Sequence, residues 1–154
     1  MPVQRDARCA NVPLLCSVHV RVRPSPSQGD WVLSEDTVQH RGSQRAFRVG
    51  HVFPETARNA EVFERTTRGL IGSVVEGESG TVLAYGQTSS GKTHAMRGCP
   101  GDAGLLQQAI EHLFVVMRAQ KKDRVFCVRI AYFEVRHSPH PPSASSAAGA
   151  TTAC

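Results

Sequence analysis

The sequence Gly86-Gln-Thr-Ser-Ser-Gly-Lys-Thr93 has the pattern G-x-x-x-x-G-K-[ST], a short glycine-framed loop that ends in a lysine and a hydroxyl residue. The two glycines let the backbone curl so that successive N–H groups point into one concavity, which suits a polyphosphate. We expect Lys92 to reach the β- and γ-phosphates and the Thr93 hydroxyl to ligate Mg²⁺. The alternative is a surface turn rich in Gly and Ser.

The residues around the loop agree with a phosphate-binding interpretation. Residues 80–85, directly before it, form a short apolar run without polar alternation, which is typical of a strand buried on both faces. Such a loop follows a strand and opens a helix, whose positive N-terminal end also attracts anions. We expect Tyr85 to lie in the core. The residues expected to contact nucleotide in the loop are Gly86, Gln87, Thr88, Ser89, Ser90, Gly91, Lys92 and Thr93.

Composition limits the class of protein. The chain has 154 residues, of which 40% are hydrophobic and 20% charged, as expected for one ordinary soluble globular domain. It contains no apolar run of membrane-spanning length and no signal-peptide pattern at its N-terminus. The five cysteines have no metal-binding spacing, which favours reduced thiols in a cytosolic protein. The net charge of +5 gives only weak support for an acidic partner, and we expect no nucleic-acid partner.

Upstream of the loop the pattern predicts strands. Residues 1–13 carry no periodicity and are expected to be a loose leader. Residues 14–23 alternate apolar and polar side chains, which predicts a strand with one buried face that ends at Pro24. Residues 31–33 and 45–49 are predicted to be short strands around a polar turn.

Two helices and a later strand are predicted further along the chain. Asn59 is a candidate N-cap of a helix that reaches about Val75, with Gly77 as its stop. The helix after the loop should be short because glycines and a proline follow it, and a second helix is predicted over residues 104–120. A long strand is predicted over residues 125–135. Residues 136–154 contain no aliphatic side chain larger than Ala and are expected to be disordered.

Several blocks together resemble the N-terminal half of a kinesin motor domain, over about residues 14–135. The resemblance rests on Val20-Arg21-Val22-Arg23-Pro24, Gly50-His51-Val52-Phe53, Asn59-Ala-Glu-Val-Phe63, Gly80-Thr-Val-Leu-Ala-Tyr-Gly-Gln-Thr-Ser-Ser-Gly-Lys-Thr-His-Ala-Met96 and Ala131-Tyr-Phe-Glu-Val135. It implies an α/β fold of the P-loop NTPase type, a doubly wound, mostly parallel sheet with helices on both faces, which would be incomplete here.

The resemblance also implies ATP and Mg²⁺ as ligands. Arg21, Arg23 and Pro24 would lie against the adenine base, and His94 would help to enclose it. A guanidinium and a proline ring can both stack on a flat base. Without the resemblance, Arg21 and Arg23 could equally be a solvated strand face and His94 an exposed helix residue.

Two later segments that kinesins use for hydrolysis are not recognisable in this sequence. An Asn-x-x-Ser-Ser-Arg type segment and an Asp-Leu-Ala-Gly type segment are both missing, and phosphoryl transfer needs more than a phosphate cradle. We therefore expect a truncated or alternatively spliced motor fragment, with non-native sequence after about Val135. An uninterrupted coding frame across that position would count against this expectation.

Two functional classes follow from the resemblance. One is the ATP-binding portion of a microtubule motor at the cytoskeleton in the cytoplasm, without membrane insertion. The other is a non-motor fragment that binds nucleotide weakly or not at all and neither hydrolyses it nor binds microtubules. A third class, another P-loop family such as a small kinase, does not predict the Arg21-Val-Arg-Pro24 block upstream of the loop.

Overall fold

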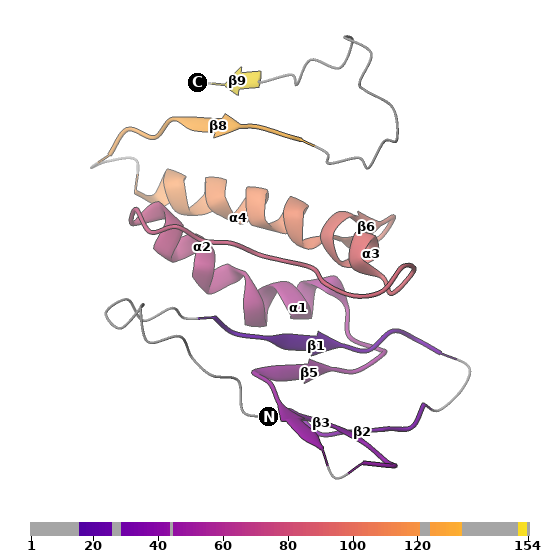
Figure 1. Ribbon diagram of the computed structural model, residues 1–154. Helices are drawn as coiled ribbons and strands as arrows, with labels where there is room; N and C mark the ends of the chain where they lie inside the picture. Colours follow the sequence, from indigo (N-terminus) through magenta and orange to yellow (C-terminus); the bar gives the residue numbers. More distant parts are fainter. Residues whose placement is uncertain (1–15, 26–28, 44, 121–123, 134–150, 154) are drawn as a thin grey trace, which may run out of the picture.

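The computed structural model describes residues 16–25, 29–43, 45–120, 124–133 and the backbone of residues 151–153 (Figure 1). Its elements in chain order are β1 (His19–Arg21), β2 (Trp31–Leu33), β3 (Thr37–His40), β4 (Ala46–Arg48), β5 (His51–Phe53), α1 (Asn59–Thr66), α2 (Arg68–Val75), α3 (Lys92–Arg97), β6 (Gly98–Cys99), β7 (Asp102–Ala103), α4 (Leu105–Ala119), β8 (Val128–Ile130) and β9 (Thr151–Ala153). The predicted leader at residues 1–13 lies outside the described residues.

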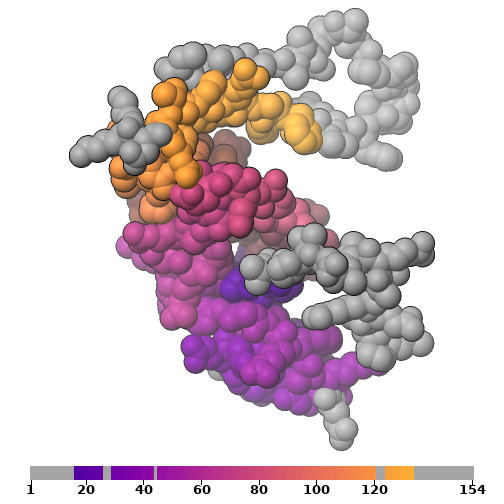
Figure 2. Space-filling model, turned by 90° about the vertical axis from the view of Figure 1, so that its left-hand side faces the viewer, coloured from indigo at the N-terminus to yellow at the C-terminus, as the bar shows by residue number. Residues whose placement is uncertain are grey.

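The elements are arranged in layers. In Figure 1 the helices α1, α2 and α4 lie between the β1–β5 pair on one side and β8 on the other. Figure 2, turned by 90°, shows the β2–β4 region in purple at one end of the molecule and the β8 region in orange at the other. The small core joins the β1–β5 layer to the helical layer, because it contains Phe53 of β5, Val62 of α1 and Leu105 of α4, together with Ala57.

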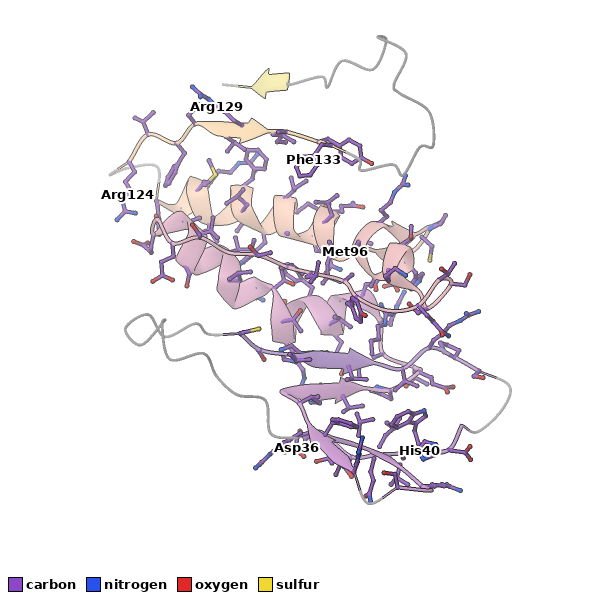
Figure 3. The ribbon with its side chains drawn as sticks, in the orientation of Figure 1. Asp36, His40, Met96, Arg124, Arg129 and Phe133 are labelled. Atoms are coloured by element: carbon purple, nitrogen blue, oxygen red, sulfur yellow. The ribbon has the colours of Figure 1, made fainter. Side chains whose placement is uncertain are left out.

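The strand pairing is mixed. β1 pairs in parallel with β5, with His19 opposite His51 and Arg21 opposite Phe53. β2, β3 and β4 form an antiparallel sheet, whose middle strand was predicted to be a polar turn. Thr37–His40 pairs on both edges, so backbone hydrogen bonds hold it as a strand despite its polar side chains. Figure 3 shows Asp36 and His40 at its two ends.

The helix predicted from Asn59 to Val75 is two helices. α1 ends at Thr66 and α2 begins at Arg68, with Thr67 between them at φ −106° and ψ −31°. The Thr66 hydroxyl donates to the carbonyl oxygen of Val62 at 2.6 Å, a back-bond that commonly bends helices. The prediction of a single helix is therefore wrong.

The start and the end of this helical pair also differ in how well they were predicted. The N-cap is Arg58, in an extended conformation, and not Asn59, whose side chain is fully buried. At the other end Gly77 follows the C-cap of α2 with φ +105°, so the predicted glycine stop is confirmed. The predicted helix over residues 104–120 is α4, which packs against α2.

Residues 80–85 do not form the buried strand that their apolar run predicts. The structure assigns them no strand, and Leu83 and Tyr85 are 83% and 95% exposed, so Tyr85 is not in the core. A parallel strand needs neighbours for its N–H and C=O groups, and within the described residues none pairs with this segment. The apolar pattern alone is not sufficient to form the strand.

The C-terminal region contains one short strand pair. The strand predicted over residues 125–135 is β8, restricted to Val128–Ile130, and it pairs antiparallel with β9. β9 belongs to the tail that was expected to be disordered; backbone pairing of residues 151–153 does not require large side chains. Residues 136–150 of that tail lie outside the described residues.

The fold is thus α/β, but the doubly wound, mostly parallel sheet is not formed among the described residues. They contain four separate small sheets, of which only β1–β5 is parallel. In the described segments no helix combines the length and the apolar character that crossing a membrane requires.

Candidate phosphate-binding site

The loop at residues 86–93 has the curled backbone that its two glycines predict. Gly91 has φ +100° and Ser89 has φ +63°, both in the left-handed region. The amide of Ser90 donates to the carbonyl oxygen of Gln87 at 3.2 Å, which closes the turn. A Cβ atom added at Gly86 would lie 2.5 Å from the Ser90 hydroxyl, so a larger residue there would displace the Ser90 side chain.

Lys92 reaches back over the loop from the first turn of α3. Its ammonium donates to the carbonyl oxygens of Gly86 and Gln87 at 2.8 and 2.7 Å. The positive charge of Lys92 therefore lies against the carbonyl oxygens at the start of the loop, which we call the mouth of the loop. A polyphosphate at this mouth would meet a cation that is already in place.

The loop also offers donors and a hydroxyl to a ligand. Within the residues that the structure describes, the backbone amides of Lys92 and Thr93 and the Thr93 hydroxyl have no hydrogen-bond partner. Unpaired amides beside a lysine suit phosphate oxygens, and an exposed threonine hydroxyl suits Mg²⁺. The residues present fit a Mg²⁺-bound polyphosphate.

Arg23 brings the end of β1 to the loop. Its guanidinium donates to the carbonyl oxygen of Ser89, which lies 66 residues later in the chain. Pro24, the next residue, is exposed. The structure therefore places Arg23 at the loop, and its predicted contact with the adenine base stays a prediction.

Arg21 faces a different group of atoms. Its guanidinium donates to the side-chain oxygen of Asn59 and, at 3.0 Å, to the carbonyl oxygen of Ala57. These contacts direct the polar edge of Arg21 toward the start of α1. Its predicted contact with a base stays a prediction.

His94 lies directly after the loop with its side chain 44% exposed. Its Nε2 atom is 3.9 Å from a carboxylate oxygen of Asp102 and 3.6 Å from the Cys99 sulfur. Its backbone carbonyl accepts a hydrogen bond from the Asn59 side chain at 3.2 Å. The Nε2 side of the imidazole thus lies against Cys99 and Asp102, and part of the side chain is accessible to solvent.

Asn59 is the residue that sequence reasoning misjudged. It is fully buried and connects Arg21, the carbonyl of His94 and the backbone carbonyl of Asp102. The Asp102 carboxylate accepts a hydrogen bond from the backbone N–H of Asn59, whose nitrogen lies 3.2 and 3.4 Å from the two carboxylate oxygens. One signal was available, because Asn59 opens one of the blocks that resemble the kinesin family.

His19 and Glu76 have pKa values below their ordinary ones. Burial, and then the neighbouring His51, lower the pKa of His19. A hydrogen bond from Gln120 and the charge of Arg124 lower the pKa of Glu76. Figure 3 shows Arg124 beside the end of α2, where its guanidinium lies 3.2 Å from Glu76.

Comparison of the sequence with known families shows the family to which the chain belongs. The family described as "Kinesin motor domain" matches residues 10–138. The chain belongs to the kinesin motor domain family. This kinesin chain is 36% identical over 125 residues to kinesin-like protein KIN-7O of Arabidopsis thaliana, covering 77% of the chain and 10% of that relative.

Other kinesin relatives match the same region. Kinesin-like protein 5 of Schizosaccharomyces pombe is 35% identical over 94 residues, 61% of this chain and 11% of the relative. Human centromere-associated protein E is 30% identical over 128 residues, 77% of this chain and 5% of the relative. The chain thus spans about a tenth or less of the length of these relatives.

Proposed function

We propose that the loop at residues 86–93 binds the polyphosphate of a Mg²⁺-bound adenine nucleotide. The observation that carries this proposal is the position of Lys92, whose ammonium lies 2.7–2.8 Å from two loop carbonyl oxygens, beside backbone amides that have no partner in the described part of the chain. Lys92 would contact the β- and γ-phosphates and Thr93 would hold Mg²⁺. The metal would neutralise phosphate charge, and Gly86 to Gly91 would supply the backbone cradle.

The base would lie where the end of β1 meets the loop. Arg23 is tied to Ser89, Pro24 is exposed beside it, and His94 presents an accessible imidazole after the loop. All three present flat or cationic surfaces that can stack on adenine. Arg21 would hold the end of β1 in place through its hydrogen bond to Asn59. It is also a candidate for contact with the base.

Membership of the kinesin family supports a wider role. We propose that residues 14–135 are the ATP-binding portion of a kinesin-like microtubule motor domain with a doubly wound sheet, flanked by the leader and the tail. The complete protein would use ATP to move along microtubules and would be located at the cytoskeleton. Co-pelleting with microtubules and microtubule-stimulated ATP turnover, measured on this chain and on a full-length product, test this role.

A comparison of MgATP with Mg²⁺–tripolyphosphate tests the nucleotide site. Both ligands should bind, because both fill the loop, and ATP should bind more tightly. His94→Ala should weaken ATP by about 1 kcal/mol, roughly fivefold, through lost base contact. The same variant should leave tripolyphosphate affinity unchanged. Equal affinity of the wild-type chain for the two ligands would contradict the adenine assignment.

A further inference from the structure

A second reactive group lies beside the proposed nucleotide site. The β6–β7 hairpin places Cys99 with its sulfur 3.6 Å from Nε2 of His94. The same nitrogen lies 3.9 Å from a carboxylate oxygen of Asp102, the residue opposite Cys99 in the hairpin. An exposed thiol, an imidazole and a carboxylate therefore converge at one point.

The backbone holds this arrangement in place. Gly98 has φ +76°, and a Cβ there would collide with the Asp102 carbonyl oxygen and the Gly104 amide. The two-residue turn between Cys99 and Asp102 is Pro-Gly, with Gly101 at φ +84°, as a type II turn requires. Arg58 donates to the Gly101 carbonyl at 2.8 Å.

Asp102 is fixed from its other side as well. Its carboxylate accepts the buried backbone amide of Asn59, so it cannot swing away from His94 without breaking that hydrogen bond. These three side chains are not placed to hold a metal ion, and neither is any other group of His, Cys, Asp and Glu side chains in the described residues. The chemistry that they support is proton transfer from a thiol.

We propose that Cys99 is a thiol-modification site that exchanges with small disulfides of the glutathione type. The Cys99 thiol proton passes to Nε2 of His94, and the Asp102 carboxylate stabilises the resulting imidazolium. The Cys99 thiolate attacks one sulfur of the disulfide, so that a new S–S bond forms and the old one breaks. The released thiolate takes up the proton, which leaves a mixed disulfide on Cys99 and one free small thiol.

Modification of Cys99 weakens nucleotide binding, a consequence that rests on the proposed function. His94 is one of the residues assigned to the base, and its Nε2 atom faces the sulfur that would carry the adduct. A tripeptide on Cys99 would occupy the space beside the imidazole and add negative charge near the phosphate loop. Oxidising conditions would thereby weaken nucleotide binding.

The chain contains its own controls. Cys16 and Cys127 are also exposed free thiols, and within the described part of the chain neither makes a hydrogen bond. They report the reactivity of an exposed cysteine without a neighbouring imidazole. Because His94 can accept the thiol proton as the Cys99 sulfur attacks, we expect Cys99 to exchange about threefold faster than these two controls.

The test is the rate of mixed-disulfide formation at each cysteine of the full chain with oxidised glutathione, measured at pH 7 by peptide mass spectrometry. Cys99 should react about threefold faster than Cys16 and Cys127. His94→Gln should remove that advantage and leave the other two rates unchanged, and its circular dichroism spectrum, compared with that of the wild-type chain, checks that the variant is folded. Equal rates in the wild-type chain, or a Cys99 rate unaffected by His94→Gln, would overturn the proposal.

A second measurement separates this proposal from the nucleotide assignment. MgATP affinity is compared before and after glutathione treatment, with treated Cys99→Ser as the matched control. The treated wild-type chain should bind more weakly, whereas the variant should be unaffected by treatment. Unchanged affinity of a chain modified at Cys99 would overturn the regulatory part. If the untreated chain binds no nucleotide, the proposed function fails, and the exchange rates still decide the thiol site.

Discussion

The side-chain amide of Asn59 donates to the backbone carbonyl oxygen of His94 at 3.2 Å, which ties the first turn of α1 to the helix that follows the phosphate loop. The same side chain accepts a hydrogen bond from Arg21 of β1. Because Asn59 has no exposed surface, these bonds form without competition from water. Asn59, which is fully buried, therefore links β1 to the helix that follows the loop.

Asn59→Ala should destabilise the chain by about 1–3 kcal/mol, because it leaves the partners of a buried amide unpaired. Urea unfolding followed by circular dichroism measures the loss. Glu61→Ala, at an exposed position of the same helix turn, is the control and should change stability by less than about 0.5 kcal/mol. Similar stabilities of the two variants would show that the Asn59 network is not formed.

Gly98→Ala should cost more than Gly91→Ala. Gly91 is left-handed, where alanine costs about 1 kcal/mol, whereas Gly98 has φ +76° and ψ −166°, a region restricted to glycine where strain costs about 1–3 kcal/mol. A Cβ at Gly91 would meet nothing within 4 Å, whereas at Gly98 it would collide with backbone atoms of the β6–β7 hairpin. Thermal unfolding of the two variants compares the costs. Equal losses would contradict the close packing of the hairpin.

Stability should fall as the pH drops below about 6.5, in part because of His19. Its pKa in the folded chain is lowered by burial and by His51 from the ordinary value of 6.5. The unfolded chain therefore binds this proton more readily, so the full stability is present above pH 6.5 and declines below it. Urea midpoints between pH 7.5 and 5 measure the slope, which His19→Gln should reduce. A variant with the wild-type slope would exclude His19 as the source.

The elements that sequence reasoning predicted well are those with strong local patterns. The helix α4 follows an apolar stripe along its whole length, and Gly77 ends α2 by its own backbone preference. β3 was missed because Thr37–His40 has a polar sequence and becomes a strand only through its neighbours on both edges.

The remaining differences depend on distant parts of the chain. Residues 80–85 have the composition of a buried strand, but a strand also requires ladder partners that their own sequence does not encode. The inward orientation of Asn59 depends on Arg21, which is 38 residues earlier, and on Asp102, which is 43 residues later. Neither contact is visible in a local pattern, whereas residues 86–93 are a local motif whose curled backbone was predictable from its two glycines.

The most direct test of the nucleotide site is calorimetric titration of the purified chain with MgATP. We predict one saturable site whose affinity falls by about 10- to 100-fold in Lys92→Ala, since a charge-assisted phosphate contact contributes about 1.5–3 kcal/mol. Arg129→Ala, which removes an exposed cation on β8, should bind like the wild-type chain. A folded wild-type chain without saturable binding, or a Lys92→Ala chain that binds MgATP as tightly as the wild type, would contradict the assignment of residues 86–93 as the phosphate site.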